Sequence, residues 1–129
     1  MVRTCLILSF AAVAYPALAH AQETRKSYPR NVITREEIQD RAPDAKSAYD
    51  VVQRLRPSFL RVRPSGSVQS QTPVPIRVYV DGSSRAGVYA LRDILSIAVI
   101  EIIYLDGNDA TTRYGTGHEN GAIVVRTGG

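Results

Sequence analysis

The chain has 129 residues, of which 22% are charged, and its formal net charge at neutral pH is +4. This length corresponds to one domain with a hydrophobic core, and the excess of basic residues is mild. The single cysteine, Cys5, excludes a fold that is stapled by disulfide bonds.

The first 21 residues have the pattern of a secretory signal peptide. Arg3 supplies the positive charge, residues 5–14 form an apolar core, and Ala19-His20-Ala21 is a small-x-small cleavage site. We predict cleavage between Ala21 and Gln22, which removes the cysteine. A buried N-terminal helix, the alternative, does not explain the cleavage triplet. The apolar core is too short to span a membrane, which takes about 20 residues, so we expect no transmembrane helix. Because the signal-peptide pattern indicates export, we expect no nucleic-acid partner.

Residues 22–30 are polar and charged, which predicts a disordered leader in front of a domain at residues 31–127. Asn31–Ile33 has the composition of a short edge strand. Thr34-Arg35-Glu36-Glu37 is a capping box: the Thr34 side chain can accept from the N–H of Glu37 while Glu37 reaches back. It predicts a helix from Arg35 to about Arg41.

A second helix is predicted to begin after Asp44 or Ser47, either of which can cap it. Its apolar residues follow the spacing i, i+3, i+4, i+7 of an amphipathic helix: Ala48, Val51, Val52 and Leu55. Pro57 ends this helix. Phe59–Arg63 alternates as a brief strand does, and Pro64–Pro75 has the composition of a loop.

A strand is predicted at Ile76–Val80, where apolar and polar residues alternate. Asp81-Gly82 then turns the chain, and Ser83–Gly87 continues as a loop. Leu91–Ile97 is predicted to form a short helix whose inward face carries Leu91, Ile94 and Leu95.

Val99–Leu105 is almost wholly β-branched, aromatic or aliphatic, which predicts a central strand. One face of this strand is entirely uncharged and consists of Ile100, Ile102 and Tyr104. Asp106-Gly107 ends the strand with a turn in which the glycine tolerates a positive φ.

The C-terminal segment is predicted to add a helix and a strand. Asn108 or Asp109 can cap one or two helical turns at Ala110–Arg113, which Tyr114-Gly115 closes. Asn120-Gly121 then turns the chain into Ala122–Thr127, a strand of strong β-propensity. The element order indicates a small α/β (α+β) fold, a mixed sheet of about four strands with short helices packed on it.

Taken together, these segments follow the order found in one known family. They are Thr34–Ile38, Leu55-Arg56-Pro57 at a helix end, Val78–Gly82, Ile94–Ile97, Ile102–Gly107, Tyr114-Gly115 and Asn120–Val125. This order resembles the plug domains of TonB-dependent outer-membrane receptors, and the resemblance covers nearly the whole chain after the signal peptide.

The resemblance implies a small mixed α/β domain of the kind that gates uptake of iron chelates, vitamin B12 or glycans inside a receptor barrel. The length leaves no room for a barrel, so we expect a stand-alone, periplasmic plug-like domain, associated with the outer membrane through a protein partner there or in the periplasm. Two alternatives stay open. One is a small periplasmic protein that binds a glycan or a metal chelate in the loops at Pro64–Pro75 and Ser83–Gly87. The other is a non-functional relic of a truncated receptor.

A cluster of arginines is the strongest candidate site for an anionic partner. The cluster consists of Arg54, Arg56, Arg61 and Arg63. Guanidinium groups bind phosphate or carboxylate with two hydrogen bonds, so this cluster could meet an anionic lipid or an acidic partner. Arginines at a helix end also serve as a solvated face, which is the competing interpretation.

Other residue patterns do not indicate chemistry. His118 and Glu119 with Asp81 or Asp109 lack metal-ligand spacing, and we expect His118 to lie in a solvated loop. No nucleophile elbow accompanies Ser83-Ser84, so no enzyme, no metal and no cofactor is expected. The aromatic residues Tyr79, Tyr104 and Tyr114 are predicted to lie in the core or at its rim.

Overall fold

The computed structural model of the protein describes residues 26–62 and 74–128. Several predicted features lie outside these residues: the signal peptide with its cleavage site at Ala21 and Gln22, the start of the leader, Arg63 and nearly all of the loop at Pro64–Pro75.

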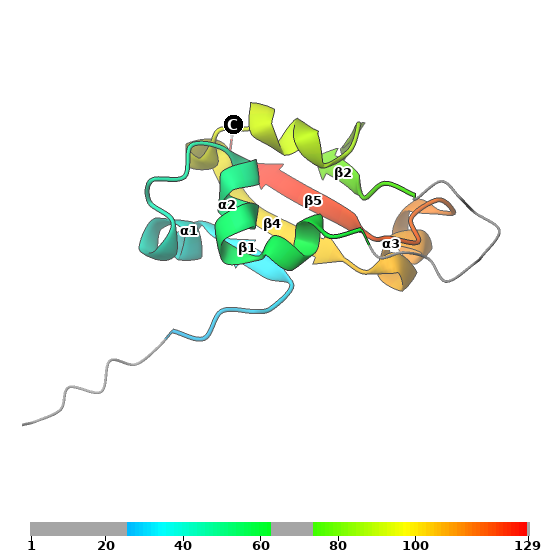
Figure 1. Ribbon diagram of the computed structural model, residues 1–129, viewed down its shortest axis with the longest axis horizontal. Helices are drawn as coiled ribbons and strands as arrows, with labels where there is room; N and C mark the ends of the chain where they lie inside the picture. The colour runs from blue at the N-terminus through cyan, green and yellow to red at the C-terminus, as the bar shows by residue number, and fades with distance from the viewer. Residues whose placement is uncertain (1–25, 63–73, 129) are drawn as a thin grey trace, which may run out of the picture.

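The described residues form a five-stranded mixed sheet in the order β1-β4-β5-β2-β3 (Figure 1). The strands are β1 (Val32–Thr34), β2 (Arg77–Val80), β3 (Ser83–Arg85), β4 (Val99–Leu105) and β5 (Ala122–Thr127). Strand β5 pairs parallel with β2 and antiparallel with β4, and the outer pairs β1–β4 and β2–β3 are antiparallel. The predicted small mixed sheet is confirmed, and β4 is an interior strand.

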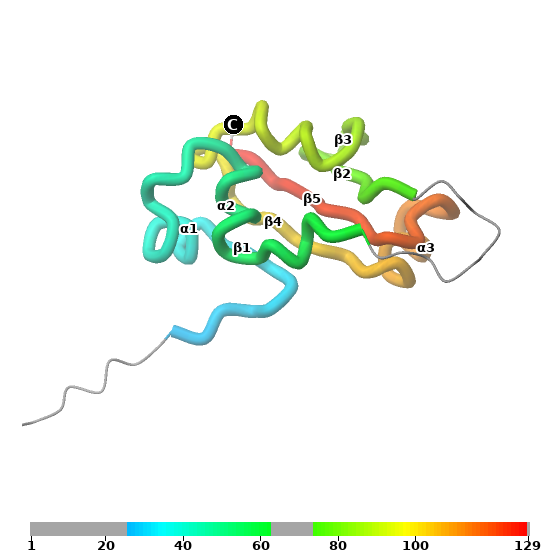
Figure 2. The backbone as a smooth tube through the Cα atoms, viewed as in Figure 1, coloured from blue at the N-terminus to red at the C-terminus, as the bar shows by residue number. Residues whose placement is uncertain are grey.

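Short helices pack against the sheet: α1 (Arg35–Arg41), α2 (Ala48–Leu55) and α3 (Gly107–Tyr114), with the 3-10 helices η1 (Pro57–Leu60), η2 (Val88–Asp93) and η3 (Ser96–Ala98). Most of them lie on one face of the sheet, whereas Tyr114 of α3 stacks on Tyr79, whose side chain points to the face opposite the core residue Val78. Figures 1 and 2 show α2, η1 and η2 on the same side of the sheet, with α1 at one end and α3 at the other.

The hydrophobic core lies between that face of the sheet and the helices. The strands contribute Ile33, Val78, Val99, Ile102, Ile123 and Val125, and the helices contribute Ile38, Ala48, Val51, Val52, Phe59 and Leu91. The amphipathic stripe that the sequence predicts on the second helix is therefore the face that α2 turns to the sheet.

The two helix starts follow the predicted capping chemistry. Thr34 Oγ1 accepts from the N–H of Glu37 at 3.3 Å, which caps α1. In α2, Ser47 and Asp50 form a complete capping box, with both side-chain to backbone distances at 3.2 Å. The predicted capping box at α1 has only one of its two hydrogen bonds, because the Glu37 carboxylate binds Arg41 and Arg56 and does not reach back to the N–H of Thr34.

Strand β4 contains a β-bulge that changes the predicted face. The register with β5 shifts between Val99 and Glu101, so Val99 and Ile102 are both fully buried. Ile100, which the strand pattern puts on the same uncharged face as Ile102, is 40% exposed. The extra residue of the bulge reverses the alternation at this one position.

Two strand and loop predictions near the middle of the chain are wrong. Phe59, expected in a strand, lies in η1, which begins at Pro57 because proline suits the first turn of a helix. Ser83–Arg85, expected in a loop, is strand β3. Asp81 and Gly82 both have positive φ, 49° and 85°, the conformation of a tight two-residue hairpin turn.

The predicted helix at Leu91–Ile97 is also wrong. This segment is η2, an extended stretch and η3, because Leu95 has φ −67° and ψ 136° and pairs with Ser47. Leu91 is buried as predicted, whereas Leu95 is exposed. The pairing with the start of α2 replaces the helical hydrogen bonds.

The start of α3 differs in its cap and in the role of its glycine. Asp106, and neither Asn108 nor Asp109, caps the helix by accepting from the N–H of Asp109 at 2.9 Å. Gly107 does not adopt the predicted positive φ but is the first helical residue. A Cβ at Gly107 would collide with the backbone of Glu119, so close approach requires glycine here.

Candidate functional site

A groove runs between α1 and the segment of residues 95–97, which leads into η3, and its volume is about 710 Å³. Its lining residues are Arg35, Ile38 and Gln39 from α1, Pro43, Ala45 and Lys46 from the connection to α2, and Leu95, Ser96 and Ile97 from the opposite wall. The lining is mostly apolar with a few polar groups, as in many binding sites of this size.

The two walls of the groove are joined by main-chain hydrogen bonds. The N–H of Ala48 donates to Ile94 O at 2.8 Å, and the N–H of Ser96 donates to Lys46 O at 3.0 Å. The hydroxyl of Ser96 also donates to Ala45 O. These bonds fix the backbone around Leu95 and Ile97, so the side chains of these two residues are not needed to hold the segment in place.

Arg35 connects α1 to the far wall. Its Nε donates to Val99 O at 3.1 Å, and its Nη2 lies 3.5 Å from Ile97 O. Arg35 and Ile100 both lie against Gly128. The guanidinium therefore holds the backbone that leads into the β4 bulge.

Large apolar side chains are concentrated on the surface beside the groove. Leu95 is 64% exposed, Ile97 is 80% exposed and Ile100 is 40% exposed. These three, which we call the apolar ridge, are three of the five large exposed hydrophobic residues in the described part of the chain, the others being Val62 and Tyr89. Exposed apolar residues scattered singly are ordinary, but a cluster of them marks an interaction site.

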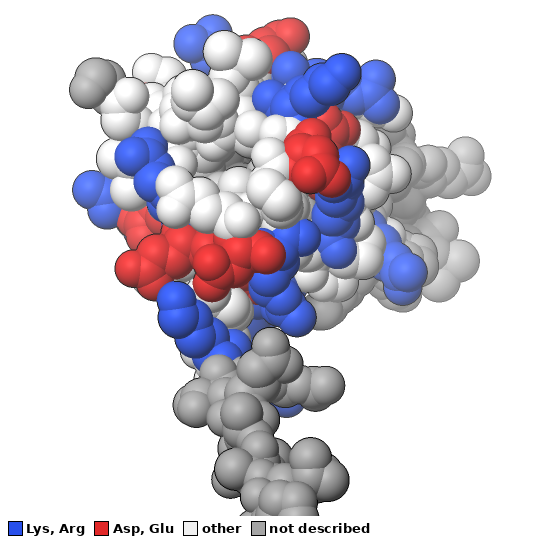
Figure 3. Space-filling view, turned by 90° about the vertical axis from the view of Figure 1, so that its left-hand side faces the viewer, with Lys and Arg blue, Asp and Glu red and all other residues white. Residues whose placement is uncertain are grey.

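The charged residues that line the groove are both cations, Arg35 and Lys46. Among the described residues neither forms an ion pair with a carboxylate. Figure 3, which shows the side of the molecule with α1, displays an uncharged area bordered by basic side chains and by an acidic group. The groove itself thus combines apolar walls with two unneutralised positive charges.

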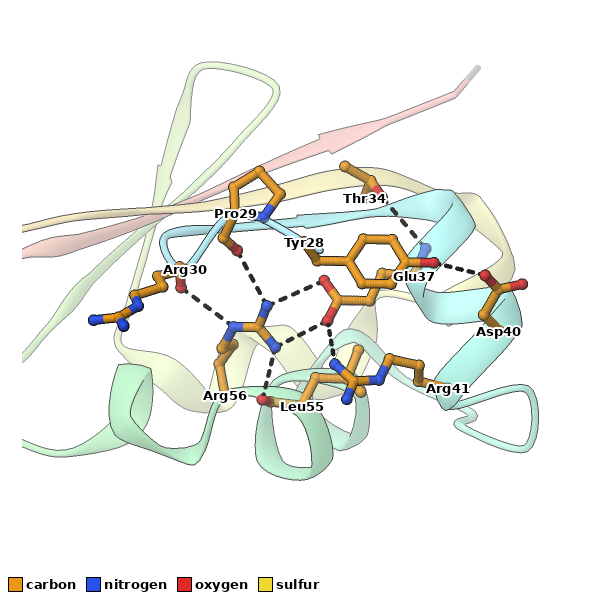
Figure 4. A network of polar contacts seen from close by, with 9 residues as sticks. All are labelled: Tyr28, Pro29, Arg30, Thr34, Glu37, Asp40, Arg41, Leu55 and Arg56. Atoms are coloured by element: carbon orange, nitrogen blue, oxygen red, sulfur yellow. Dashed lines mark hydrogen bonds and ion pairs between the residues drawn. The ribbon is translucent and has the colours of Figure 1, made fainter. Parts of the chain in front are cut away.

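A second cluster, around Glu37, is structural. Glu37 is 0% exposed, and its carboxylate pairs with Arg56 through Nη1–Oε1 at 2.9 Å and Nη2–Oε2 at 3.3 Å (Figure 4). Arg41 adds a contact of 3.2 Å to the same carboxylate. Arg56 also donates to the carbonyls of Pro29 and Arg30 at 3.1 and 3.2 Å. The cluster ties the chain before β1 to both α1 and α2.

Part of the segment predicted as a leader therefore contacts the domain. Besides the two carbonyls bound by Arg56, the hydroxyl of Tyr28 donates to Asp40 at 2.6 Å. This hydrogen bond raises the pKa of Tyr28 to about 12, with smaller contributions from desolvation and from the charge of Asp40. The same bond, followed by the nearby Lys26 charge, lowers the pKa of Asp40.

The predicted arginine cluster is not assembled as one free surface. Arg56 is bound to Glu37 and to three carbonyls, and its side chain is only 17% exposed. Arg54 pairs with Asp44 at 3.4 Å, Arg61 is exposed, and Arg63 lies outside the described residues. Of this set, Arg54, Arg56 and Arg61 are described, and none of the three lines the groove.

The prediction of a solvated loop at His118 is wrong, because His118 is only 5% exposed. Its Nδ1 lies 2.8 Å from Gly115 O, and its Nε2 lies 2.8 Å from the hydroxyl of Tyr79. A carbonyl only accepts, so Nδ1 donates to Gly115 O, and Nε2 shares a hydrogen bond with the Tyr79 hydroxyl. Tyr114 stacks on Tyr79 with centroids 3.9 Å apart, so the rings and the imidazole fill this end of the sheet.

The remaining predicted turn residues serve the fold. Gly115 ends α3 with φ 92°, and Asn120 Nδ2 donates to Val74 O at 2.6 Å. Gly121 has φ 88°, and a Cβ there would lie 2.5 Å from Leu105 O, so the predicted glycine requirement is confirmed. Asp81 binds both the N–H and the hydroxyl of Thr127, which lowers its pKa.

Within residues 26–62 and 74–128, no group of three or more histidine, cysteine, aspartate or glutamate side chains is placed to hold a metal ion. In the same residues, no helix is both long and apolar enough to cross a membrane.

The groove was not predicted from the sequence. The available signal was Leu95-Ser96-Ile97, in which two large apolar residues flank a serine as in an extended segment with one apolar face. The helical interpretation of this stretch concealed that signal by turning Leu95 inward.

Comparisons of this chain with protein-family models, with curated proteins and with solved structures found no match.

Proposed function

We propose that this chain is an exported, non-catalytic, plug-like domain that acts as an accessory interaction module of outer-membrane uptake or envelope machinery. In this proposal the groove and the apolar ridge bind a protein partner in the periplasm or outer membrane. The signal-peptide pattern of residues 1–21 supports export, and the order of the plug-like segments supports a place in the envelope.

The observation that carries the proposal is the exposure of Leu95, Ile97 and Ile100 beside a largely apolar groove. Isoleucine side chains that stay exposed to water do not stabilise the folded monomer. The β4 bulge turns one of them, Ile100, outward. Bulges recur where a protein re-aims a side chain for function.

The energy available from this surface indicates a reversible contact. Covering the three partly exposed side chains contributes about 3 to 5 kcal/mol by the usual value for burying a Leu or Ile side chain. Association itself costs at least as much, about 4 to 15 kcal/mol, in lost translational and rotational freedom. A partner must therefore also use the groove, and we expect a transient complex.

The proposal is tested by site-specific photocrosslinking in a Gram-negative cell that produces the chain with its own N-terminal 21 residues. The crosslinking residue replaces Ile97 in one strain and Ser84, which is exposed on β3, in the control strain. We expect one envelope protein to be crosslinked from position 97 but not from position 84. Detection of a mature N-terminus at Gln22 in the periplasmic fraction tests export in the same cells.

Equal or absent crosslinking from both positions would refute the interaction module at this surface. Crosslinking only from position 84 would move the contact to the β3 edge of the sheet. A chain that retains residues 1–21 in the cytoplasm would refute export.

A further inference from the structure

We infer that the groove receives a segment of the partner protein whose apolar side chains lie next to a carboxylate. This inference rests on the proposed function and specifies the chemistry of the partner. In this arrangement the apolar side chains lie between Ile97 and the apolar lining on α1, and the carboxylate pairs with Lys46 and Arg35.

The first argument concerns shape. Leu95 and Ile97 are 64% and 80% exposed, so they project beyond the groove that they line. A small molecule lying in the groove would leave the outer side of these residues in water. A protein segment can fill the groove and cover the projecting side chains together, as in the docking of an apolar helix face into a groove.

The second argument concerns charge. Lys46 and Arg35 are the charged residues of the lining, and among the described residues no carboxylate neutralises them. Complementary charges across an interface determine which partner and which orientation are accepted. A segment with Asp or Glu beside its apolar residues is therefore favoured over a basic one.

The third argument excludes a lipid surface as the occupant. Glu36 and Asp40 are exposed on α1, the helix that forms one wall, and Figure 3 shows acidic side chains directly beside the uncharged area. An anionic membrane would have to approach these carboxylates at the same time as the two cations. A discrete segment can place its carboxylate against the cations alone.

The two cations have different roles, and only one of them is a useful probe. Arg35 also donates to Val99 O and approaches Ile97 O, so its replacement would disturb the wall. The Lys46 side chain is exposed, and only its backbone carbonyl takes part in the wall. Lys46 therefore tests the charge of the groove without removing its support.

The experiment is a selection of displayed random 12-residue peptides on the purified chain. Peptides that still bind the Ile97→Asp variant are discarded, because they bind elsewhere. We expect the remaining peptides to combine leucine, isoleucine or phenylalanine with an excess of Asp and Glu. Their affinities are then measured by fluorescence polarisation of labelled copies.

Three variants calibrate the charge dependence. Lys46→Met, which keeps an apolar side chain of similar length, should weaken binding about threefold, and Lys46→Glu should weaken it about tenfold. Arg85→Glu makes the same change of charge on β3, at the opposite edge of the sheet from β1, and should leave the affinity unchanged. Melting curves of all variants confirm that each is folded.

Selected peptides without an acidic excess, or equal affinities for the chain and for Lys46→Glu, would overturn the inference. If no peptide is selected, the groove does not recognise a segment, and the inference also fails. Dodecanoate serves as the probe for a fatty anion, and displacement of selected peptides by submicellar dodecanoate would assign the groove to that ligand instead. In each of these cases crosslinking from position 97 still decides the proposed function separately.

Discussion

Replacement of Arg56 by methionine tests whether the Glu37 cluster holds the fold together. The change removes both hydrogen bonds between the guanidinium and the carboxylate, at 2.9 and 3.3 Å, and the two bonds to the carbonyls of Pro29 and Arg30. Glu37 is 0% exposed and keeps only Arg41 as a cationic partner.

The expected cost follows from this geometry. Removing one partner of a buried ion pair typically costs 3 to 5 kcal/mol, because the other charge stays buried. Arg41 still contacts the carboxylate, so we expect a loss near the lower limit, about 3 kcal/mol. A domain of this size has roughly 5 to 15 kcal/mol in total, so the variant should fold with much reduced stability.

The assay is urea unfolding at pH 7 followed by circular dichroism, where a loss of about 3 kcal/mol lowers the midpoint by about 1 to 3 M. Arg54→Met is the matched control, since Arg54 lies in the last turn of α2, two residues before Arg56, and makes only an exposed pair with Asp44 at 3.4 Å. That control should lose less than about 1 kcal/mol. The double variant Glu37→Leu with Arg56→Met should recover part of the loss because no charge remains buried.

A loss below about 1 kcal/mol for Arg56→Met, or a double variant less stable than the single one, would refute this reasoning. Either result would mean that solvent reaches Glu37 when the arginine is absent.

Three further changes test the core, a turn and a pH dependence. Ile102→Asp should abolish the cooperative melting transition, because it places an unpaired charge at a fully buried position of β4; a normal melting curve would contradict the core assignment. Gly121→Val should lower the free energy of unfolding in urea by more than about 1 kcal/mol, because φ is 88° and a Cβ would lie 2.5 Å from Leu105 O. Gly82 also has a positive φ but has open space around it, so Gly82→Val measures the backbone strain without the steric collision. The hydrogen bonds from Thr127 lower the pKa of Asp81. Its contribution to stability is therefore fully present above the ordinary aspartate pKa and is lost as the pH falls from that value through the lowered pKa of the folded state. Asp81→Asn should flatten the acid side of the stability profile, and an unchanged profile would refute the role of these bonds.

The sequence predicted elements well where the pattern was local. The cap at Thr34 correctly predicted the start of α1, and the apolar stripe correctly predicted the buried face of α2. Both patterns depend only on residues within one or two helical turns. The β-branched runs that became β4 and β5 were equally clear.

The errors arose where distant residues decide the conformation. Leu95 is extended because Ser47 pairs with it, and Ile100 is exposed because the bulge shifts the register against β5. His118 is buried because Tyr79, 39 residues away, forms a hydrogen bond with it and Tyr114 stacks on Tyr79. The candidate groove depends on the first of these contacts, so the local pattern of Leu95-Ser96-Ile97 was not enough to locate it.

The place of β5 has a consequence for how the domain forms. This last strand of the chain lies in the middle of the sheet and is the link between β4 and β2. Until it is inserted, the β1–β4 ribbon and the β2–β3 hairpin share no strand-to-strand contact. A nascent or truncated chain that ends before Ala122 therefore holds two separate ribbons with open edges, and such edges are the sites where unfinished chains join one another.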